Sequence, residues 1–183
     1  NARLVMDLNV KKVDGVANIF AQNEIDGCLT QPIFGYSDVA MTKKSHDHKV
    51  DNIASLSKLS IVSYQRATTL LGEEYKKAVS AAKHYKEVAK PEDQAQLLAS
   101  DLVDVSIGDK YIFMQSIKTW SKEQANVNDY VIHPIFPPVA SSMGFNNQKH
   151  CEEFDQALKK FKASGEYQAV YDKHLKRLGY KTK

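Results

Sequence analysis

Two short stretches of the chain carry residue types that can bind a small charged molecule. In "SIVSYQRATTLLGEEY", residues 60–75, an apolar β-branched stretch runs through a short polar turn into a helix that begins near Thr68 and Thr69. Free backbone N–H groups and the helix dipole favour an anion such as a carboxylate at this position. Arg66, just before this turn, has a guanidinium that can hold the same carboxylate through two hydrogen bonds. The stretch predicts an anion site, and helix capping by Thr68 alone, with a solvated Arg66, is the open alternative.

The second stretch is "VDVSIGD", which alternates as a strand and ends at Asp109. The Asp109 carboxylate can accept hydrogen bonds from a ligand ammonium group, or it can cap the helix that begins at Lys110. In an open α/β sheet, ligands bind beyond the carboxyl ends of the strands. An anion site and a carboxylate on neighbouring strand ends together suit a zwitterion.

The elements that must position these residues alternate between strand and helix from residue 59 to residue 120. The expected strands are 59–64, 84–89 and 103–109, and the expected helices are 69–83, 91–100 and 110–120. This order predicts an α/β fold with a largely parallel sheet. Before it we expect a helix at 3–12, a strand at 13–20 and an extended segment at 34–42. After it, "YVIHPIF" is extended, and beyond Pro137–Pro138 the remainder is expected to be helical.

Composition is that of an ordinary globular protein that forms one large or two small domains. The chain has 183 residues, 43% of them hydrophobic and 26% charged. Its net charge of +3 comes from 25 basic and 22 acidic residues that are mixed along the chain, which argues against nucleic acid as a partner. No stretch approaches the roughly 20 consecutive apolar residues of a membrane span, and no signal peptide is recognisable.

The cysteines and histidines predict no metal centre and no catalytic set. Cys28 and Cys151 lack a CxxC spacing, and two buried thiols are favoured over a single bridge. His46 and His48 lie in a polar loop with no third ligand nearby, which favours solvent. The thiol of Cys151 could have the neighbouring His150 as its base, but adjacent residues on a helix point in different directions. We therefore expect no metal, no cofactor and no enzymatic activity, with a reaction at His150–Cys151 as a minor alternative.

Five blocks of the sequence resemble, in the same order, those of the family 3 extracellular solute-binding proteins of the amino-acid-binding type. They are "KVDGVANIF", "YSDVAMTKK", "LSKLSIVSYQRATTLLGEEY", "LLASDLVDVSIGD" and "FDQALKKFKASGEYQAVYDKHL". The resemblance implies a two-lobed, type II periplasmic-binding-protein-like fold with mostly parallel sheets, whose lobes close over a small ligand. It also implies a periplasmic location, with an ABC transporter permease or a membrane sensor as partner.

The resemblance assigns roles to the same residues. Ala67-Thr68-Thr69 matches the family's Gly-Thr-Thr turn, which usually binds an α-carboxylate, and Asp109 matches the aspartate that usually meets the α-amino group. Two features depart from the family. The segment "AQNEIDGC" lacks the arginine that usually clamps the carboxylate, for which Arg66 is the candidate substitute. The family also has a strand, a helix and a second strand before the position of Arg3, so the first lobe is expected to be incomplete.

We therefore expect a first lobe of residues 3–43 plus 139–183 and a second lobe of residues 44–138. The expected function is non-catalytic binding of a small polar solute, an amino acid or related carboxylate, in a cleft between the lobes, for uptake or sensing. The alternative is a remnant that no longer binds ligand and acts through self-association. Because an incomplete lobe exposes strand edges and apolar surface, a homo-oligomer or a segment-exchanged dimer is also expected.

Overall fold

The computed structural model describes residues 2–180, which form two compact units. Unit 1 comprises Asn1–Tyr36 and Pro138–Lys173, and unit 2 comprises Ser37–Pro137 and His174–Lys183. The division differs from the expected one because the strand β4 (Asp38–Lys43) pairs with strands of unit 2. Residues 174–180 also belong to unit 2, where Leu178 packs in the core.

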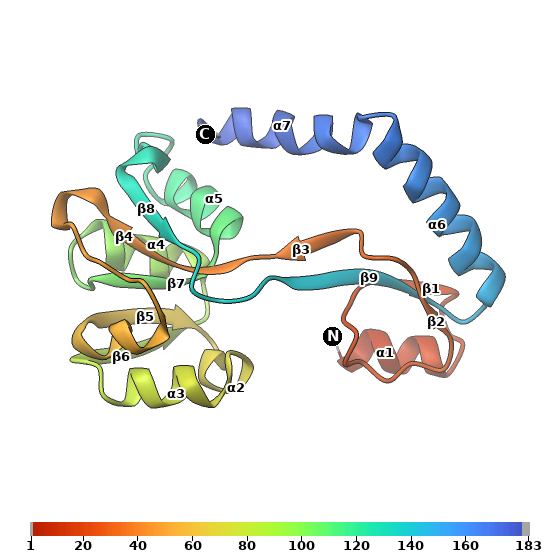
Figure 1. The fold of residues 1–183 in the computed structure, drawn as a ribbon, viewed down its shortest axis with the longest axis horizontal. Helices are drawn as coiled ribbons and strands as arrows, with labels where there is room; N and C mark the ends of the chain where they lie inside the picture. The colour runs from red at the N-terminus through yellow and green to blue at the C-terminus, as the bar shows by residue number, and fades with distance from the viewer. Residues whose placement is uncertain (1, 181–183) are drawn as a thin grey trace. The chain divides into compact units, whose positions relative to one another are not determined.

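Unit 2 is built on a five-stranded mixed sheet of order β6-β5-β7-β4-β8 (Figure 1). Besides β4, its strands are β5 (Ser60–Tyr64), β6 (His84–Val88), β7 (Val105–Asp109) and β8 (Tyr130–His133). The pairs of β5 with β6 and with β7 are parallel, whereas β4 runs antiparallel to β7 and to β8. The expectation of mostly parallel sheets is therefore wrong, because the strand-helix-strand repeat that makes parallel pairs covers only residues 60–109.

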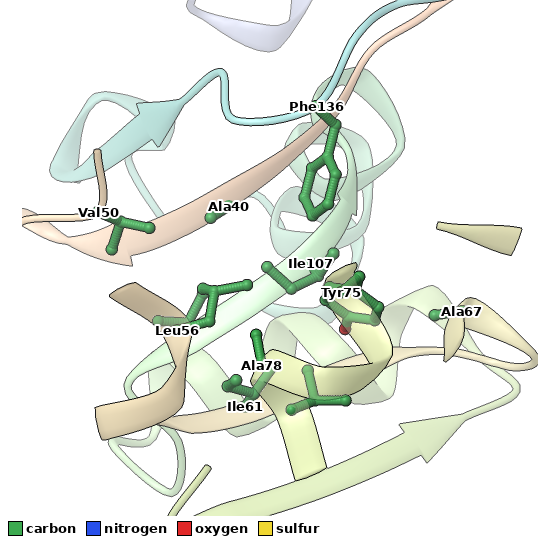
Figure 2. Packing of buried hydrophobic residues seen from close by; sticks show 11 residues of the cluster. Ala40, Val50, Leu56, Ile61, Ala67, Tyr75, Ala78, Ile107 and Phe136 are labelled. Carbon is green, nitrogen blue, oxygen red and sulfur yellow. The ribbon is translucent and has the colours of Figure 1, made fainter. Parts of the chain in front are cut away.

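Helices cover both faces of the unit 2 sheet, as the alternation of side chains along a strand requires. The helices are α2 (Ala67–Leu70), α3 (Gly72–Ser80), α4 (Pro91–Ala99) and α5 (Lys110–Trp120). Ala40 of β4 lies in the core cluster that contains Tyr75 of α3, which is shown in Figure 2. Its neighbours Val39 and Met41 lie in a second cluster, with residues of α4 and α5.

The single helix expected at 69–83 is two helices. Gly72 has a φ of 87°, in the left-handed region where a side chain is strained, and it separates α2 from α3. The sequence pattern missed this break because Leu70, Leu71 and Tyr75 keep a helical spacing across it.

Unit 1 contains a small antiparallel sheet around one central strand, β9 (Val139–Phe145). Its other strands are β1 (Gly15–Ile19), β2 (Cys28–Leu29) and β3 (Phe34–Tyr36), and each pairs with β9. The sequence analysis placed no strand after Pro138, so β9 corrects it. The segment "VASSMGF" is rich in small residues and lacks the regular apolar alternation of a half-buried strand.

The helices of unit 1 bury little of their surface. They are α1 (Ala2–Asn9), α6 (Gln148–Ala163) and α7 (Glu166–Leu178), whose last residues belong to unit 2. The core cluster of unit 1 consists of Leu8, Val16 and Ile19, with three partly buried apolar residues packed against it. Within residues 2–180, no helix is both long enough and apolar enough to cross a membrane.

A disulfide joins Cys28 of β2 to Cys151 of α6, with a Cα–Cα distance of 6.3 Å. The expectation of two buried thiols is therefore wrong. The bridge forms because β2 pairs with the end of β9 and α6 follows directly after β9, which brings residues 123 positions apart next to each other. It also removes the thiol on which a reaction at His150–Cys151 would depend.

Candidate functional site

The carboxyl edge of the unit 2 sheet gathers polar side chains from four strands. β5 ends at Tyr64, and Glu87 lies next to the end of the neighbouring strand β6. On the other side β7 ends at Asp109, and the antiparallel β4 begins at Asp38, which is paired with Asp109 in the register. The candidate site is this edge, where ligands bind in open α/β sheets.

At the Thr68 turn, where the sequence predicts a site for a ligand carboxylate, the donors hold a carboxylate of the chain itself. Glu87 Oε2 accepts a hydrogen bond from the backbone N–H of Arg66 at 2.7 Å. Glu87 Oε1 accepts from the Thr68 N–H at 3.2 Å, from the Thr68 hydroxyl at 3.3 Å and from the Tyr85 hydroxyl at 2.8 Å. The sequence analysis did not consider Glu87, which lies about 20 residues away along the chain.

These hydrogen bonds stabilise the charged form of Glu87. Burial raises the pKa of the Glu87 carboxyl, but the hydrogen bonds from Tyr85, Arg66 and Thr68 outweigh burial, so its pKa is lowered from 4.5. The Tyr85 hydroxyl keeps its proton, because burial and its neighbours Tyr75 and Glu87 raise its pKa. Tyr85 therefore acts as a donor to a permanently charged carboxylate at neutral pH.

Arg66 and Thr69 contribute differently from what the sequence predicts. Arg66 directly precedes α2 and has a φ of 66°. Its backbone N–H donates to Glu87, and the residue is exposed to solvent. Thr69 is also exposed, and its N–H donates to the Arg66 carbonyl. Among the three residues predicted for this turn, Thr68 is therefore the one whose side chain donates a hydrogen bond to the Glu87 carboxylate.

Asp109 caps α5, which is the alternative that the sequence left open. Its Oδ1 accepts hydrogen bonds from the backbone N–H groups of Tyr111 at 2.8 Å and Ile112 at 3.1 Å. Its Oδ2 accepts from the Ser37 N–H at 3.0 Å, and the residue is 9% exposed. Both carboxylate oxygens therefore hold backbone in place, at the start of α5 and just before β4.

Asp38 is the carboxylate of this edge that keeps acceptor capacity. Within the described part of the chain, it accepts one hydrogen bond, from the Tyr64 hydroxyl to Oδ2 at 2.9 Å. Asp38 is half-buried, and burial raises the pKa of its carboxyl, as does the charge of Asp109, against the lowering effect of Tyr64. The sequence analysis missed Asp38, because its register opposite Asp109 follows only from the pairing of β4 with β7.

Carboxylates gather at this edge, beside the exposed side chain of Arg66. Three carboxylates lie there, Glu87, Asp38 and Asp109, and two of them are held by backbone N–H groups. A positively charged group that approaches this edge meets the free acceptor oxygen of Asp38 and the phenolic oxygen of Tyr64. The arrangement is suited to binding, and its polar groups do not form a nucleophile paired with a base.

Solved structures of known proteins are similar to this chain in their fold. No protein-family model and no curated protein matches the chain. A solved ancestral cationic amino acid solute-binding protein is similar, with a TM-score of 0.70 and 18% identity over 92% of this chain and 72% of that one. An amino acid ABC transporter substrate-binding protein from Streptococcus pneumoniae, bound to L-arginine, has a TM-score of 0.65 and 16% identity over 96% and 73%.

A sensor domain of a histidine kinase, described as similar to periplasmic binding proteins, is a third similar structure. Its TM-score is 0.63, with 14% identity over 95% of this chain and 75% of that one. At such identities the likeness establishes the fold. The chain therefore has the two-lobed periplasmic-binding-protein-like fold, and the resemblance to amino-acid-binding proteins noted in the sequence is confirmed at that level.

Proposed function

We propose that this chain binds a small polar solute of the amino-acid type, without chemically changing it, at the carboxyl edge of the unit 2 sheet. The observation that carries the proposal is the half-buried Asp38, whose carboxylate keeps acceptor capacity at this edge. The fold supports it, since similar structures are named as amino-acid-binding proteins and one is bound to L-arginine. In this proposal, Asp38 accepts hydrogen bonds from the positively charged group of the solute.

The other residues of the edge have positioning roles in this proposal. Tyr64 orients Asp38 through its hydroxyl, and Asp109 fixes the backbone just before β4. Thr68 holds Glu87, while the exposed Thr69 and the Arg66 side chain are proposed to contact the rest of the solute.

We propose that binding serves uptake or sensing in the periplasm, with an ABC transporter permease or a membrane sensor as the partner. The similar structures include a transporter substrate-binding protein and a kinase sensor domain. The Cys28–Cys151 disulfide supports this location, because disulfides persist in oxidising compartments such as the bacterial periplasm.

Replacing Asp38 with Asn is expected to weaken solute binding by about tenfold or more, because a charge-assisted hydrogen bond becomes a neutral one. Isothermal titration calorimetry with L-arginine measures the change in Kd. Asp47→Asn is the matched control, since Asp47 is an exposed aspartate of unit 2 beyond the other end of β4. Equal affinities of the wild type and Asp38→Asn would contradict the assignment.

Affinity is also expected to fall on acidification, and to begin falling above the ordinary Asp value of 3.8, because the pKa of Asp38 is raised by burial. A protonated carboxyl no longer attracts a cation, so the loss appears as pH falls through the raised pKa. Titrations across this range are expected to show the step in the wild type and to lack it in Asp38→Asn. The same step in both proteins would assign it to another group.

Self-association is the second candidate function, and the apolar surface of α1 favours it. Met6 is 57% exposed and Leu4 is 40% exposed, and just beyond the helix Val10 is 65% exposed. A second copy that covered this surface would supply the apolar contacts that the small core of unit 1 lacks. Light scattering is expected to find a dimer that Met6→Asp converts to a monomer, and a monomeric wild type would exclude this candidate.

A further inference from the structure

We propose that Glu87 sets the charge class of the solute, because its carboxylate occupies the place that a solute carboxylate would take at the Thr68 turn. The chain would then prefer a cation without a carboxylate, such as an amine or a guanidine, to the corresponding amino acid. This inference rests on the proposed function and narrows its substrate class.

The donors of the turn are already engaged. The Arg66 N–H, the Thr68 N–H and the Thr68 hydroxyl all point to the two oxygens of Glu87. A solute carboxylate that competes for these donors must first displace Glu87, and it must also replace the hydrogen bond from Tyr85. The internal carboxylate has the advantage of being part of the same chain, so it loses no translational freedom when it binds.

Glu87 reaches the turn from a different strand. It lies on β6, 19 residues beyond Thr68 and 21 beyond Arg66, and the parallel pairing of β5 with β6 places it opposite Ser63. This register sets Glu87 beside the turn that follows β5. A capping side chain within the turn could accept from the Arg66 and Thr68 N–H groups. In this chain the acceptor is instead the charged carboxylate of Glu87, which is distant in sequence.

The two neighbouring carboxylates act in the same direction, whereas the exposed Arg66 side chain carries the opposite charge. Asp38 and Asp109 lie at the same edge of the sheet, and their charges interact. A displaced Glu87 would keep its negative charge but lose the hydrogen bonds that stabilise it, and a solute carboxylate would add a further negative charge to the edge. A solute that carries only positive charge is bound without either cost.

The test compares two probes that differ only by a carboxylate, L-arginine and agmatine, on the wild type and on Glu87→Ala. We expect the wild type to bind agmatine more tightly than L-arginine. Glu87→Ala frees the donors of the Thr68 turn, so we expect the preference to shift by about tenfold or more toward L-arginine. Glu87→Thr, which also removes the carboxylate and keeps a residue type that is common in strands, is a second variant in case Glu87→Ala is unfolded.

Glu153→Ala is the control, since it removes an exposed carboxylate of α6 in unit 1 and should leave the preference unchanged. Circular dichroism establishes that each variant is folded. A wild type that prefers L-arginine, or a Glu87 variant with an unshifted preference, would overturn the inference while the proposed function stands. Binding of neither probe by the folded wild type and the folded variants would overturn both.

Discussion

Removal of the Cys28–Cys151 disulfide is expected to lower the free energy of unfolding of unit 1 by about 2–5 kcal/mol, the usual range for a native disulfide. The physical reason is the small amount of apolar surface that holds this unit together. Its core cluster has three buried residues, and α6 buries only Cys151 and Leu158 along its 16 residues. The measurement is hydrogen exchange of the wild type with and without dithiothreitol, followed for the amides of β9 and α6.

The protection of unit 2 is the internal reference, because the sequence has no other cysteine than the two of unit 1. The double variant Cys28→Ala/Cys151→Ala is expected to behave like the reduced wild type and to be insensitive to the reductant. Polar contacts from α6 remain in either case, among them the bond from the Gln31 N–H to Asp155 at 2.8 Å. Equal protection of β9 and α6 before and after reduction would show that these contacts suffice.

Replacing Asp109 with Ala is expected to destabilise unit 2 by about 2–4 kcal/mol. Loss of a helix cap costs roughly 0.5–2 kcal/mol, and a buried N–H left without an acceptor costs about 1–3 kcal/mol. Asp109 is 9% exposed and supplies both functions, to α5 through Oδ1 and to Ser37 through Oδ2. Urea unfolding monitored by circular dichroism measures the change.

Asp109→Asn provides the comparison that separates the two functions. Its amide oxygen can still cap α5, but its NH2 group cannot accept from the Ser37 N–H, so an intermediate loss of stability is expected. If Asp109→Ala unfolds at the wild-type urea concentration, water replaces the carboxylate at both places and Asp109 is free to serve a ligand instead.

The alternation of strands and helices in unit 2 could be predicted from the sequence because each element there carries its own periodic signal. β5 and β7 are apolar and β-branched, and α5 buries Phe113, Met114 and Ile117 at helical spacing. The strand β9 carries no such signal, since Ser141, Ser142 and Gly144 occupy its middle. It is a strand because strands on both of its sides pair with it.

The candidate site was predictable only in its chemistry. The Thr68 turn does bind a carboxylate, as the free N–H groups of a helix start suggest, and Asp109 does lie at the end of a strand. Which carboxylate fills the turn depends on the register of β5 and β6, and which aspartate remains able to accept depends on the register of β4 and β7. Such a register depends on which faces of two strands are buried together in the assembled sheet, so it could not be predicted from each strand alone.

The proposal that a solute binds at the carboxyl edge of the unit 2 sheet is tested most directly by an NMR titration that follows the backbone amides. Agmatine and L-arginine are added in turn to the 15N-labelled protein. The account predicts that the largest shifts fall at this edge, on the amides of Ser37 and Asp38 and of the turn from Gln65 to Thr69. Absence of shifts with both probes, or shifts confined to residues far from this edge, would contradict it.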